Sequence, residues 1–301
     1  MKLAMVGLGK MGGFMTERLL GDGHEVVAYD RSTDAVAAAA AKGATGASSL
    51  ADAVSRLAAP RAVWVMLPDG PPTHDTIVEL STLLSPGDVI IDGGNTNYKV
   101  HLATVTEISS SGVSVVDAGT SGGVWGLKEG YCLMVGGDPA AVSTVEPIFL
   151  TLAPPGGYAH VGPPGAGHFV KMVHNGIEYG LMQAYAEGFE IMASATEFDI
   201  DLHEVSAIWR YGSVVRSWLL ELIELALADS QGFAGIEGVV TDTGEGRWTV
   251  QEAVDRAVSA PVITTALFAR FASRDANSLS NRLVSAMRHQ FGGHAVVSSG
   301  N

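Results

Sequence analysis

Short, nearly continuous apolar runs recur at regular intervals along the first half of the chain. Short apolar runs, bounded by Gly, Pro, Asn, Asp and Ser, are separated by longer stretches of helical character. Apolar strands that alternate with helices are typical of a parallel sheet covered on both faces. The pattern therefore predicts a doubly wound, Rossmann-like α/β domain. Strands are expected at residues 2–6, 25–29, 62–67, 88–92, 114–117, 131–135 and 158–161, and helices at 13–20, 73–84 and 98–109.

The second half of the chain shows only helical patterns. A segment rich in Pro and Gly, residues 151–167, separates the two halves. We therefore expect an α/β domain at 1–163 and an all-helical domain at 164–301. Several helices carry apolar surface that is difficult to cover within a domain of this size, so subunit association is expected. The residues are Trp218, Leu219, Leu220, Leu222, Ile223 and Leu225. The expected helices are 166–195, 202–210, 214–228, 249–257, 262–274 and 279–291.

Composition and charge exclude several classes of protein. The 301 residues carry a formal net charge of −14, which argues against a broad nucleic-acid or anionic-membrane surface but permits a small anionic substrate. Cys132 is the only cysteine, so an intrachain disulfide and a cysteine metal cluster are excluded, and no metal is expected. Its apolar surroundings predict a packed strand residue. Neither a signal peptide nor a long apolar span is evident, so a soluble, cytoplasmic protein is expected.

A glycine-rich turn follows the first predicted strand. Gly7, Gly9 and Gly12 form the G-x-G-x-x-G pattern between a strand and a helix, which is the context that dinucleotide binding requires. Gly7 permits the tight turn, Gly9 lets the backbone approach a pyrophosphate, and Gly12 lets the helix pack on the strand. Glycine-rich turns are common in α/β proteins, so this pattern alone is a weak indication.

Asp30 ends the second predicted strand, at about the 20-residue spacing from the glycines where an acid can bind the adenosine ribose. An acid there would also repel a 2′-phosphate, which favours NAD. The neighbouring Arg31 can accommodate that phosphate and leaves NADP open. The alternative role for Asp30 is to end the strand or cap the helix that follows Ser32. With the fingerprint complete, we favour the cofactor role.

Polar residues recur along one face of the long helix predicted at 166–195. Lys171, His174, Asn175, Glu178 and Tyr179 share an arc that a buried helix would normally fill with apolar residues. Burying such groups without partners is costly, so they should line a cavity or bind a ligand or one another. An inter-helix polar network or a solvated face is the alternative interpretation.

Further candidate binding groups lie elsewhere in the chain. The run Ser121-Gly122-Gly123 offers backbone N–H groups and a hydroxyl that suit a carboxylate or phosphate. Basic groups recur in the second half, and helix-end charge or surface solvation is the more common explanation for any one of them taken singly. They are Arg247, which follows a glycine-spaced loop at 244–248, Arg270, Arg288 and His294.

Together these motifs resemble the 6-phosphogluconate dehydrogenase family, in its short, NAD-preferring bacterial form within the β-hydroxyacid dehydrogenase superfamily. The combination of Ser121-Gly-Gly123 with Lys171-x-x-His-Asn-x-x-Glu-Tyr179 is specific, since the wider superfamily generally lacks the His-Asn and Glu-Tyr pairs. The resemblance covers nearly the whole chain. The matching segments are 7–12, 92–95, 117–130, 165–179, 244–248, 266–270 and 288–294.

The resemblance implies oxidative decarboxylation of 6-phosphogluconate to ribulose 5-phosphate and CO2, a step of the pentose phosphate route, with NAD, or NADP, as oxidant. Lys171 would be the general base and Glu178 the acid that protonates C1. The carboxylate and hydroxyls of the substrate would be held by Asn95, Ser121, Gly122, Gly123, His174 and Asn175, and its phosphate by Tyr179, Arg270, Arg288 and His294. The cofactor would be held by Gly7, Leu8, Gly9, Lys10, Met11, Gly12, Asp30, Arg31, Ser32, Leu67, Pro68 and Asn95.

The family also implies that Arg288 and His294 come from a neighbouring subunit, so a homodimer or homotetramer with shared active sites is expected. Two positions depart from the common pattern. Thr243 stands where the family carries a phosphate-side lysine, and Arg247 is a candidate replacement. The NADP-dependent form has an Asn-Arg-Thr type turn where this chain has Asp30-Arg31-Ser32. The rival hypotheses are a dehydrogenase of a small β-hydroxyacid such as 3-hydroxyisobutyrate and a non-catalytic nucleotide sensor.

Overall fold

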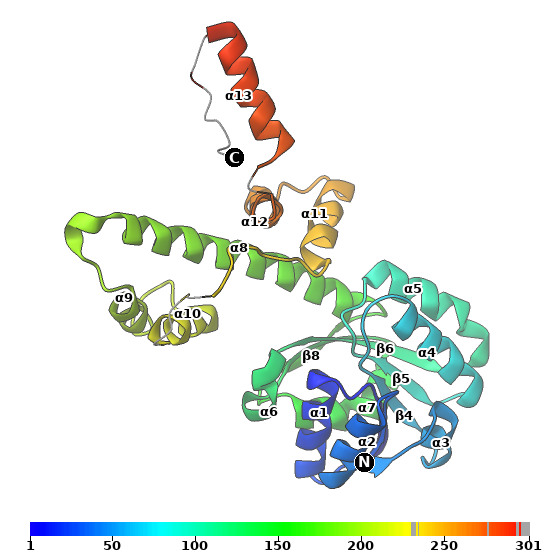
Figure 1. Ribbon diagram of the computed structural model, residues 1–301. Helices are drawn as coiled ribbons and strands as arrows, with labels where there is room; N and C mark the ends of the chain where they lie inside the picture. The colour runs from blue at the N-terminus through cyan, green and yellow to red at the C-terminus, as the bar shows by residue number, and fades with distance from the viewer. Residues whose placement is uncertain (230–232, 234, 276, 293–294, 296–301) are drawn as a thin grey trace. The chain divides into compact units, whose positions relative to one another are not determined.

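The computed structural model describes residues 1–229, 233, 235–275, 277–292 and 295. The chain divides into two compact units, Met1–His174 and Asn175–Asn301, and Figure 1 labels the elements of both. In the part of the chain that the structure describes, no helix combines the length and the apolar character needed to cross a membrane.

The first unit is built on one eight-stranded sheet with the order β3-β2-β1-β4-β5-β6-β7-β8. The sheet is parallel except where β6 and β7 pair in antiparallel fashion. The strand order reverses beside β1, which is where ligands bind in open α/β sheets. The strands are β1 Lys2–Val6, β2 Glu25–Tyr29, β3 Thr45–Gly46, β4 Ala62–Val65, β5 Val89–Asp92, β6 Ser114–Ser121, β7 Cys132–Gly136 and β8 Tyr158–Gly162.

Helices cover both faces of this sheet because alternate strand residues point to opposite faces and both sets are apolar. Leu3 and Met5 of β1 pack with the helices of one face, whereas Ala4 and Val6 pack with those of the other. The first face carries α1 Lys10–Gly21, α2 Thr33–Ala41 and α7 Pro139–Leu152, and the second carries α3 Leu50–Ser55, α4 Pro71–Leu83 and α5 Tyr98–Glu107. A short helix, α6 Gly126–Glu129, precedes β7.

Long helix α8, Ala166–Ser194, begins in the first unit and continues into the second without a break. The helices that follow pair locally, α9 with α10 and α11 with α12 (Figure 1). In the described part of the second unit every longer regular element is a helix. These are α9 Leu202–Trp209, α10 Trp218–Ala228, α11 Glu245–Asp255, α12 Pro261–Ala272 and α13 Leu279–Gly292.

The predicted fold class is confirmed, with local corrections. The helix predicted at 214–228 begins only at Trp218, after the hydroxyl of Ser217 caps it, and the strand predicted at 62–67 ends at Val65. Strand β6 continues to Ser121, beyond the predicted end at residue 117, because its second half pairs with β7. Cys132 lies in the predicted strand but is exposed, since it is the first residue of β7 and the next residue, Leu133, points into the core. Residues 245–248, predicted as a loop, form the first turn of α11 directly after Gly244.

Candidate functional site

The glycine turn after β1 is closely packed. Gly7 has a φ of +94°, and a Cβ placed there would lie 2.3 Å from the carbonyl oxygen of Met66, beyond β4. A Cβ at Gly12 would lie 1.9 Å from the carbonyl oxygen of Gly7. Gly9 differs from both, because its Cβ would meet no atom within 4 Å. Gly9 therefore faces open space at the N-terminus of α1, where a pyrophosphate could bind backbone N–H groups.

This geometry predicts different outcomes for two similar substitutions. Gly12→Ala forces the carbonyl of Gly7 to move, so we expect the free energy of unfolding to fall by about 1–3 kcal/mol even without cofactor. Gly9→Ala should leave the stability of the cofactor-free protein unchanged, because its added methyl group meets nothing in the protein. Gly9→Ala should nevertheless weaken NAD binding. Denaturant unfolding and fluorescence titration with NADH measure the two effects, and equal stability of the two variants would contradict the prediction.

Asp30 follows β2 and is held beside the glycine turn. One carboxylate oxygen accepts a hydrogen bond from the backbone N–H of Leu8 (2.7 Å) and the other from that of Ser32 (2.8 Å). The cap of helix α2 is instead the hydroxyl of Ser32, which accepts from the N–H of Ala35. Each carboxylate oxygen has a second lone pair, so Asp30 can still accept from a ribose hydroxyl.

The other expected cofactor residues lie at the same edge of the sheet, because they follow neighbouring parallel strands. Leu67 is half-buried and Pro68 is exposed just after β4, and Asn95 is exposed just after β5. Within the glycine turn, Leu8 is buried, Met11 is half-buried and Lys10 is exposed. Arg31 is exposed beside Asp30. The turn, Asp30 and these loops are thus placed to hold a dinucleotide together.

The turn after β6 lies beyond this same edge. Ser121 is the last residue of β6, and the glycines that follow both adopt left-handed conformations, with φ of +136° at Gly122 and +52° at Gly123. Such a conformation favours glycine over any other residue. The serine hydroxyl and successive backbone N–H groups can bind an anionic group here.

Lys171 and His174 lie in the first turns of α8, within the first unit. Lys171 is buried, with 9% of its surface exposed, and its Nζ lies 3.4 Å from Nδ1 of His174. A Cβ at Gly119 of β6 would lie 2.5 Å from Cβ of Lys171, so the helix lies directly against the strand. The predicted helix is confirmed, and it brings this lysine next to the strand that ends in Ser121.

In the second unit, Tyr179 is 6% exposed and lies next to Arg270, whose guanidinium carbon is 3.4 Å from the centroid of the Tyr179 ring. The Tyr179 hydroxyl accepts from the N–H of Thr243 at 3.5 Å. The structure thus brings together two of the predicted phosphate ligands. Asn175 and Glu178 lie in α8 and are half-buried, and Arg288 is exposed in α13. The other predicted ligand, His294, lies outside the described residues.

Arg247 binds a carboxylate of its own unit. Its Nε donates to Oδ2 of Asp242 at 2.5 Å, and Arg274 binds the other oxygen. The hydrogen bond from Arg247, with support from Arg274, lowers the pKa of Asp242 to about 2 although burial opposes this. The hydroxyl of Thr243, at the position of the missing lysine, donates to Glu245 at 2.5 Å.

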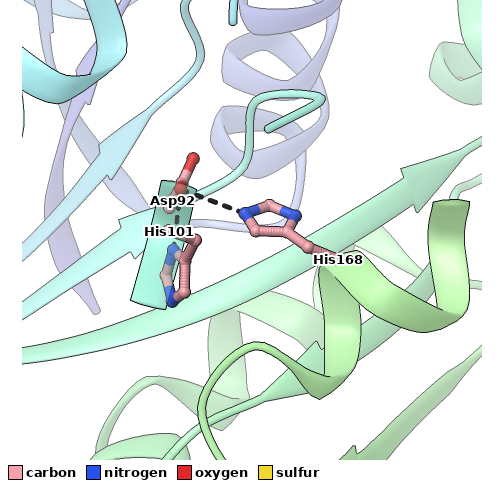
Figure 2. Close-up of side chains that lie close together, drawn as sticks. All are labelled: Asp92, His101 and His168. Atoms are coloured by element: carbon pink, nitrogen blue, oxygen red, sulfur yellow. Dashed lines mark hydrogen bonds and ion pairs between the residues drawn. The ribbon is translucent and has the colours of Figure 1, made fainter. Parts of the chain in front are cut away.

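Sequence reasoning missed a cluster of buried charged groups at the start of α8. Figure 2 shows Asp92, at the end of β5, between His101 of α5 and His168 of α8. Oδ2 of Asp92 lies 2.9 Å from Nδ1 of His101 and 3.0 Å from Nε2 of His168. These three side chains are close enough together to ligate one metal ion. The sequence held one indication, since His168 lies one helical turn before Lys171.

Electrostatic attraction between the carboxylates and the imidazoles stabilises this cluster. Burial disfavours a charged His168, but Asp92, with Asp117 and Asp69, outweighs it and raises the pKa of His168. Burial also disfavours a charged Asp92, yet His168 and His101 hold the pKa of Asp92 well below its usual range. The charged form of each group therefore favours the charged form of the other, which offsets the cost of burying them.

Comparison with known proteins agrees with this geometry. Residues 2–162 match the model of the NAD binding domain of 6-phosphogluconate dehydrogenase, and residues 167–280 match that of the 6-phosphogluconate dehydrogenase C-terminal domain. The NAD(+)-dependent, decarboxylating 6-phosphogluconate dehydrogenase of Haloferax volcanii is 44% identical over 299 residues, covering 99% of each chain. The NADP(+)-dependent, decarboxylating enzyme of Bacillus subtilis is 36% identical, over 90% of this chain and 61% of its own.

A solved structure agrees as well. The 6-phosphogluconate dehydrogenase of Plasmodium falciparum superposes with a TM-score of 0.83 and 28% identity, and the match covers 100% of this chain and 67% of that one. Both family models and a relative of the same length thus match nearly the whole chain. The chain belongs to the 6-phosphogluconate dehydrogenase family.

Proposed function

We propose that this protein catalyses the oxidative decarboxylation of 6-phospho-D-gluconate to D-ribulose 5-phosphate and CO2, with reduction of NAD or NADP. The observation that carries the proposal is the 44% identity, over the full length of both chains, to a decarboxylating 6-phosphogluconate dehydrogenase. The buried Lys171 beside His174 supplies the amine that the reaction needs.

The first chemical step, oxidation at C3 of the substrate, requires a base that removes the proton of the 3-hydroxyl. The nicotinamide, when bound, supplies the hydride acceptor. Lys171 takes the hydroxyl proton, a role that suits a buried amine because burial favours its neutral form. His174 lies within 3.4 Å of the amine and orients it. The open space at Gly9 and the carboxylate of Asp30 fit the pyrophosphate and the ribose of the cofactor.

Decarboxylation follows from the chemistry of the product, since a 3-keto acid loses CO2 readily when its carbonyl accepts the electrons. Protonated Lys171 stabilises the negative charge that develops on this oxygen. Glu178 then donates a proton to C1 of the enediol. The two groups are seven residues apart on one continuous helix, so helical periodicity gives them the same face.

The remaining predicted residues orient the substrate. Asn95, Ser121, Gly122, Gly123, His174 and Asn175 hold the carboxylate and hydroxyls. Tyr179 and Arg270 hold the phosphate, supported by their contact in the structure. Arg247 adds positive charge near this position but shares Asp242 with Arg274, so it replaces the missing lysine only in part. In the proposed division of labour, residues 1–163 bind the cofactor, and residues 164–301 bind the substrate and the neighbouring subunit.

We propose a homodimer or homotetramer in which Arg288 and His294 of one subunit complete the phosphate site of another. Large apolar side chains on the second unit's helices are exposed, which is typical of a surface that another subunit covers. They include Ile191 (69%), Ile208 (58%), Leu225 (54%), Phe268 (58%) and Met287 (55%).

The direct test is to incubate the protein with 6-phosphogluconate and either NAD or NADP and to measure reduced nicotinamide and CO2. We expect both products in equal amounts. Turnover of 3-hydroxyisobutyrate in preference to the phosphorylated sugar acid, or no turnover with either cofactor, would reject the proposal.

We further propose that NAD is preferred. Asp30→Ala should lower kcat/KM for NAD relative to NADP by about 10–100-fold, because a hydrogen bond to a charged group is worth about 1.5–3 kcal/mol. Asp30 also braces Leu8, and loss of this brace affects both cofactors alike. The ratio of the two kcat/KM values therefore isolates the ribose contact.

Arg31→Ala is the matched control for the cofactor preference. It leaves both hydrogen bonds of Asp30 in place, because their donors are Leu8 and the backbone of Ser32. We expect it to weaken NADP use and to leave kcat/KM for NAD unchanged. A ratio that stays constant in Asp30→Ala would mean that Asp30 serves only as a brace.

A further inference from the structure

Four buried ionisable side chains meet where α8 begins. Asp92 and Asp117 are fully buried, and His101 and His168 are 1% and 2% exposed. They come from β5, β6, α5 and α8, which are far apart in the sequence. Burying two carboxylates costs several kcal/mol each unless opposite charge and hydrogen bonds compensate. The cluster is therefore maintained by specific contacts rather than by the hydrophobic core around it.

Asp117 holds the first turn of α8. Its Oδ1 accepts from the N–H of Gly165 at 2.7 Å, and its Oδ2 accepts from the N–H of His168 at 2.8 Å. The first N–H groups of a helix have no partner within the helix, and a negative charge there also interacts favourably with the helix dipole. One buried carboxylate thus satisfies two of these groups.

Asp92 contacts the same turn through the side chain of His168, whose Nε2 lies 3.0 Å from Oδ2 of Asp92. Asp92 also accepts a hydrogen bond from the hydroxyl of Thr96, at 3.2 Å, through its other oxygen. Asn95, predicted to contact both cofactor and substrate, lies in the loop between these two residues. One carboxylate therefore connects the loop that carries Asn95 with the helix that carries Lys171.

Glycines allow the first turn of α8 to pack so closely against the sheet that the turn has little room to move. A Cβ at Gly167 of α8 would lie 2.4 Å from the carbonyl oxygen of Met134, and one at Gly136 of β7 would lie 2.7 Å from the N–H nitrogen of Gly167. Gly119 makes the equally close approach to Lys171 described above. The turn is pressed against β6 and β7, so a change in its anchoring carboxylates must be transmitted to the lysine.

We propose that Asp92, Asp117, His101 and His168 are positioning residues that fix the first turn of α8 and, through it, set the place of the Lys171 amine relative to Asn95. The inference rests on the proposed function, in which Lys171 is the base. His101 completes the cluster, since its Nδ1 binds Asp92 and its Nε2 lies 3.6 Å from Oδ1 of Asp117. None of the four needs to touch the substrate.

The test compares Asp117→Asn, His168→Gln and His101→Gln with Asp88→Asn as the matched control. Asp88 is a buried carboxylate (1% exposed) at the opposite end of β5 and is paired with Arg61 at 3.0 Å. We expect the three cluster variants to lose kcat by about 10²-fold, the loss that a 1 Å misplacement can cause. KM for the substrate and Kd for NADH should change little. The control should lose stability and keep its kcat per folded enzyme.

Hydrogen exchange gives a second readout that does not depend on the reaction. Amides 165–171 should exchange faster by about 2–30-fold in Asp117→Asn, as expected for a lost helix cap, and should be unchanged in Asp88→Asn. An unaltered kcat in all folded cluster variants would overturn the proposal. So would a stoichiometric metal ion that survives dialysis and is lost in His101→Gln. If the unmodified protein failed to turn over 6-phosphogluconate, the proposed function would fail, while exchange at 165–171 would still report whether the cluster anchors the helix.

Discussion

Lys171→Met is expected to lower kcat by about 10²–10⁴-fold, the range that general acid–base catalysis contributes. Methionine has nearly the length of lysine without its amine, so packing against Gly119 is retained while proton transfer and charge stabilisation are lost. The variant should fold, because methionine replaces a buried amine with an apolar side chain of similar length, and burying an apolar group carries no desolvation cost for a polar atom. Initial rates of NADH formation, with thermal unfolding measured in parallel, give the result.

The control for this experiment is Lys42→Met. Lys42 is an exposed lysine at the end of α2, paired with Glu17, and no role in catalysis is proposed for it. Its kcat should equal that of the unmodified protein, and both variants should bind NADH equally well. A Lys171→Met protein with full activity would show that Lys171 is not the base and that another group takes the proton of the 3-hydroxyl.

Glu178→Gln is expected to have the second largest effect. Glutamine fills the same volume but has no acidic proton, so delivery of the proton to C1 should slow by about 10²–10⁴-fold. The same group removes that proton in the reverse direction. Exchange of the C1 hydrogen of ribulose 5-phosphate with D2O, followed by NMR in the presence of the enzyme and NADPH or NADH, therefore measures this step separately from oxidation.

Glu190→Gln supplies the comparison, because Glu190 is an exposed carboxylate farther along α8. Exchange at C1 should proceed at the normal rate in this variant. Normal exchange in Glu178→Gln as well would assign the acid to another residue. Slow exchange combined with unimpaired oxidation of a phosphate-free β-hydroxyacid would indicate that the protein acts on a smaller substrate.

The elements that the sequence predicted well are those whose signals are local. Near-continuous apolar runs located β1, β2 and β5 almost to the residue, and the uninterrupted polar stripe located α8. The glycine turn was predicted because two close approaches, at Gly7 and Gly12, permit no side chain. Each of these features depends on residues that are close in the sequence, or on a position where the backbone packs too closely for any side chain.

Long-range pairing explains what was missed. Strand β6 continues to Ser121 only because β7 pairs with its second half, and residues 118–121 alone read as a turn. Asp92, Asp117 and His101 read as ordinary strand-end and helix residues until the fold brings them to His168. Exposure of Cys132 likewise depends on where β7 begins in the sheet, and an apolar run does not reveal that.

The double contact of Asp30 constrains how cofactor preference can be redesigned. A residue at position 30 that is compatible with a 2′-phosphate cannot carry a negative charge. The N–H groups of Leu8 and Ser32 nevertheless still require a hydrogen-bond acceptor there. Asparagine keeps one acceptor oxygen, whereas alanine keeps none. A change toward NADP should therefore proceed through Asp30→Asn, which exchanges charge for neutrality while retaining one support of the glycine turn. A substitution that removes both acceptors would destabilise the glycine turn, and this would weaken the binding of either cofactor.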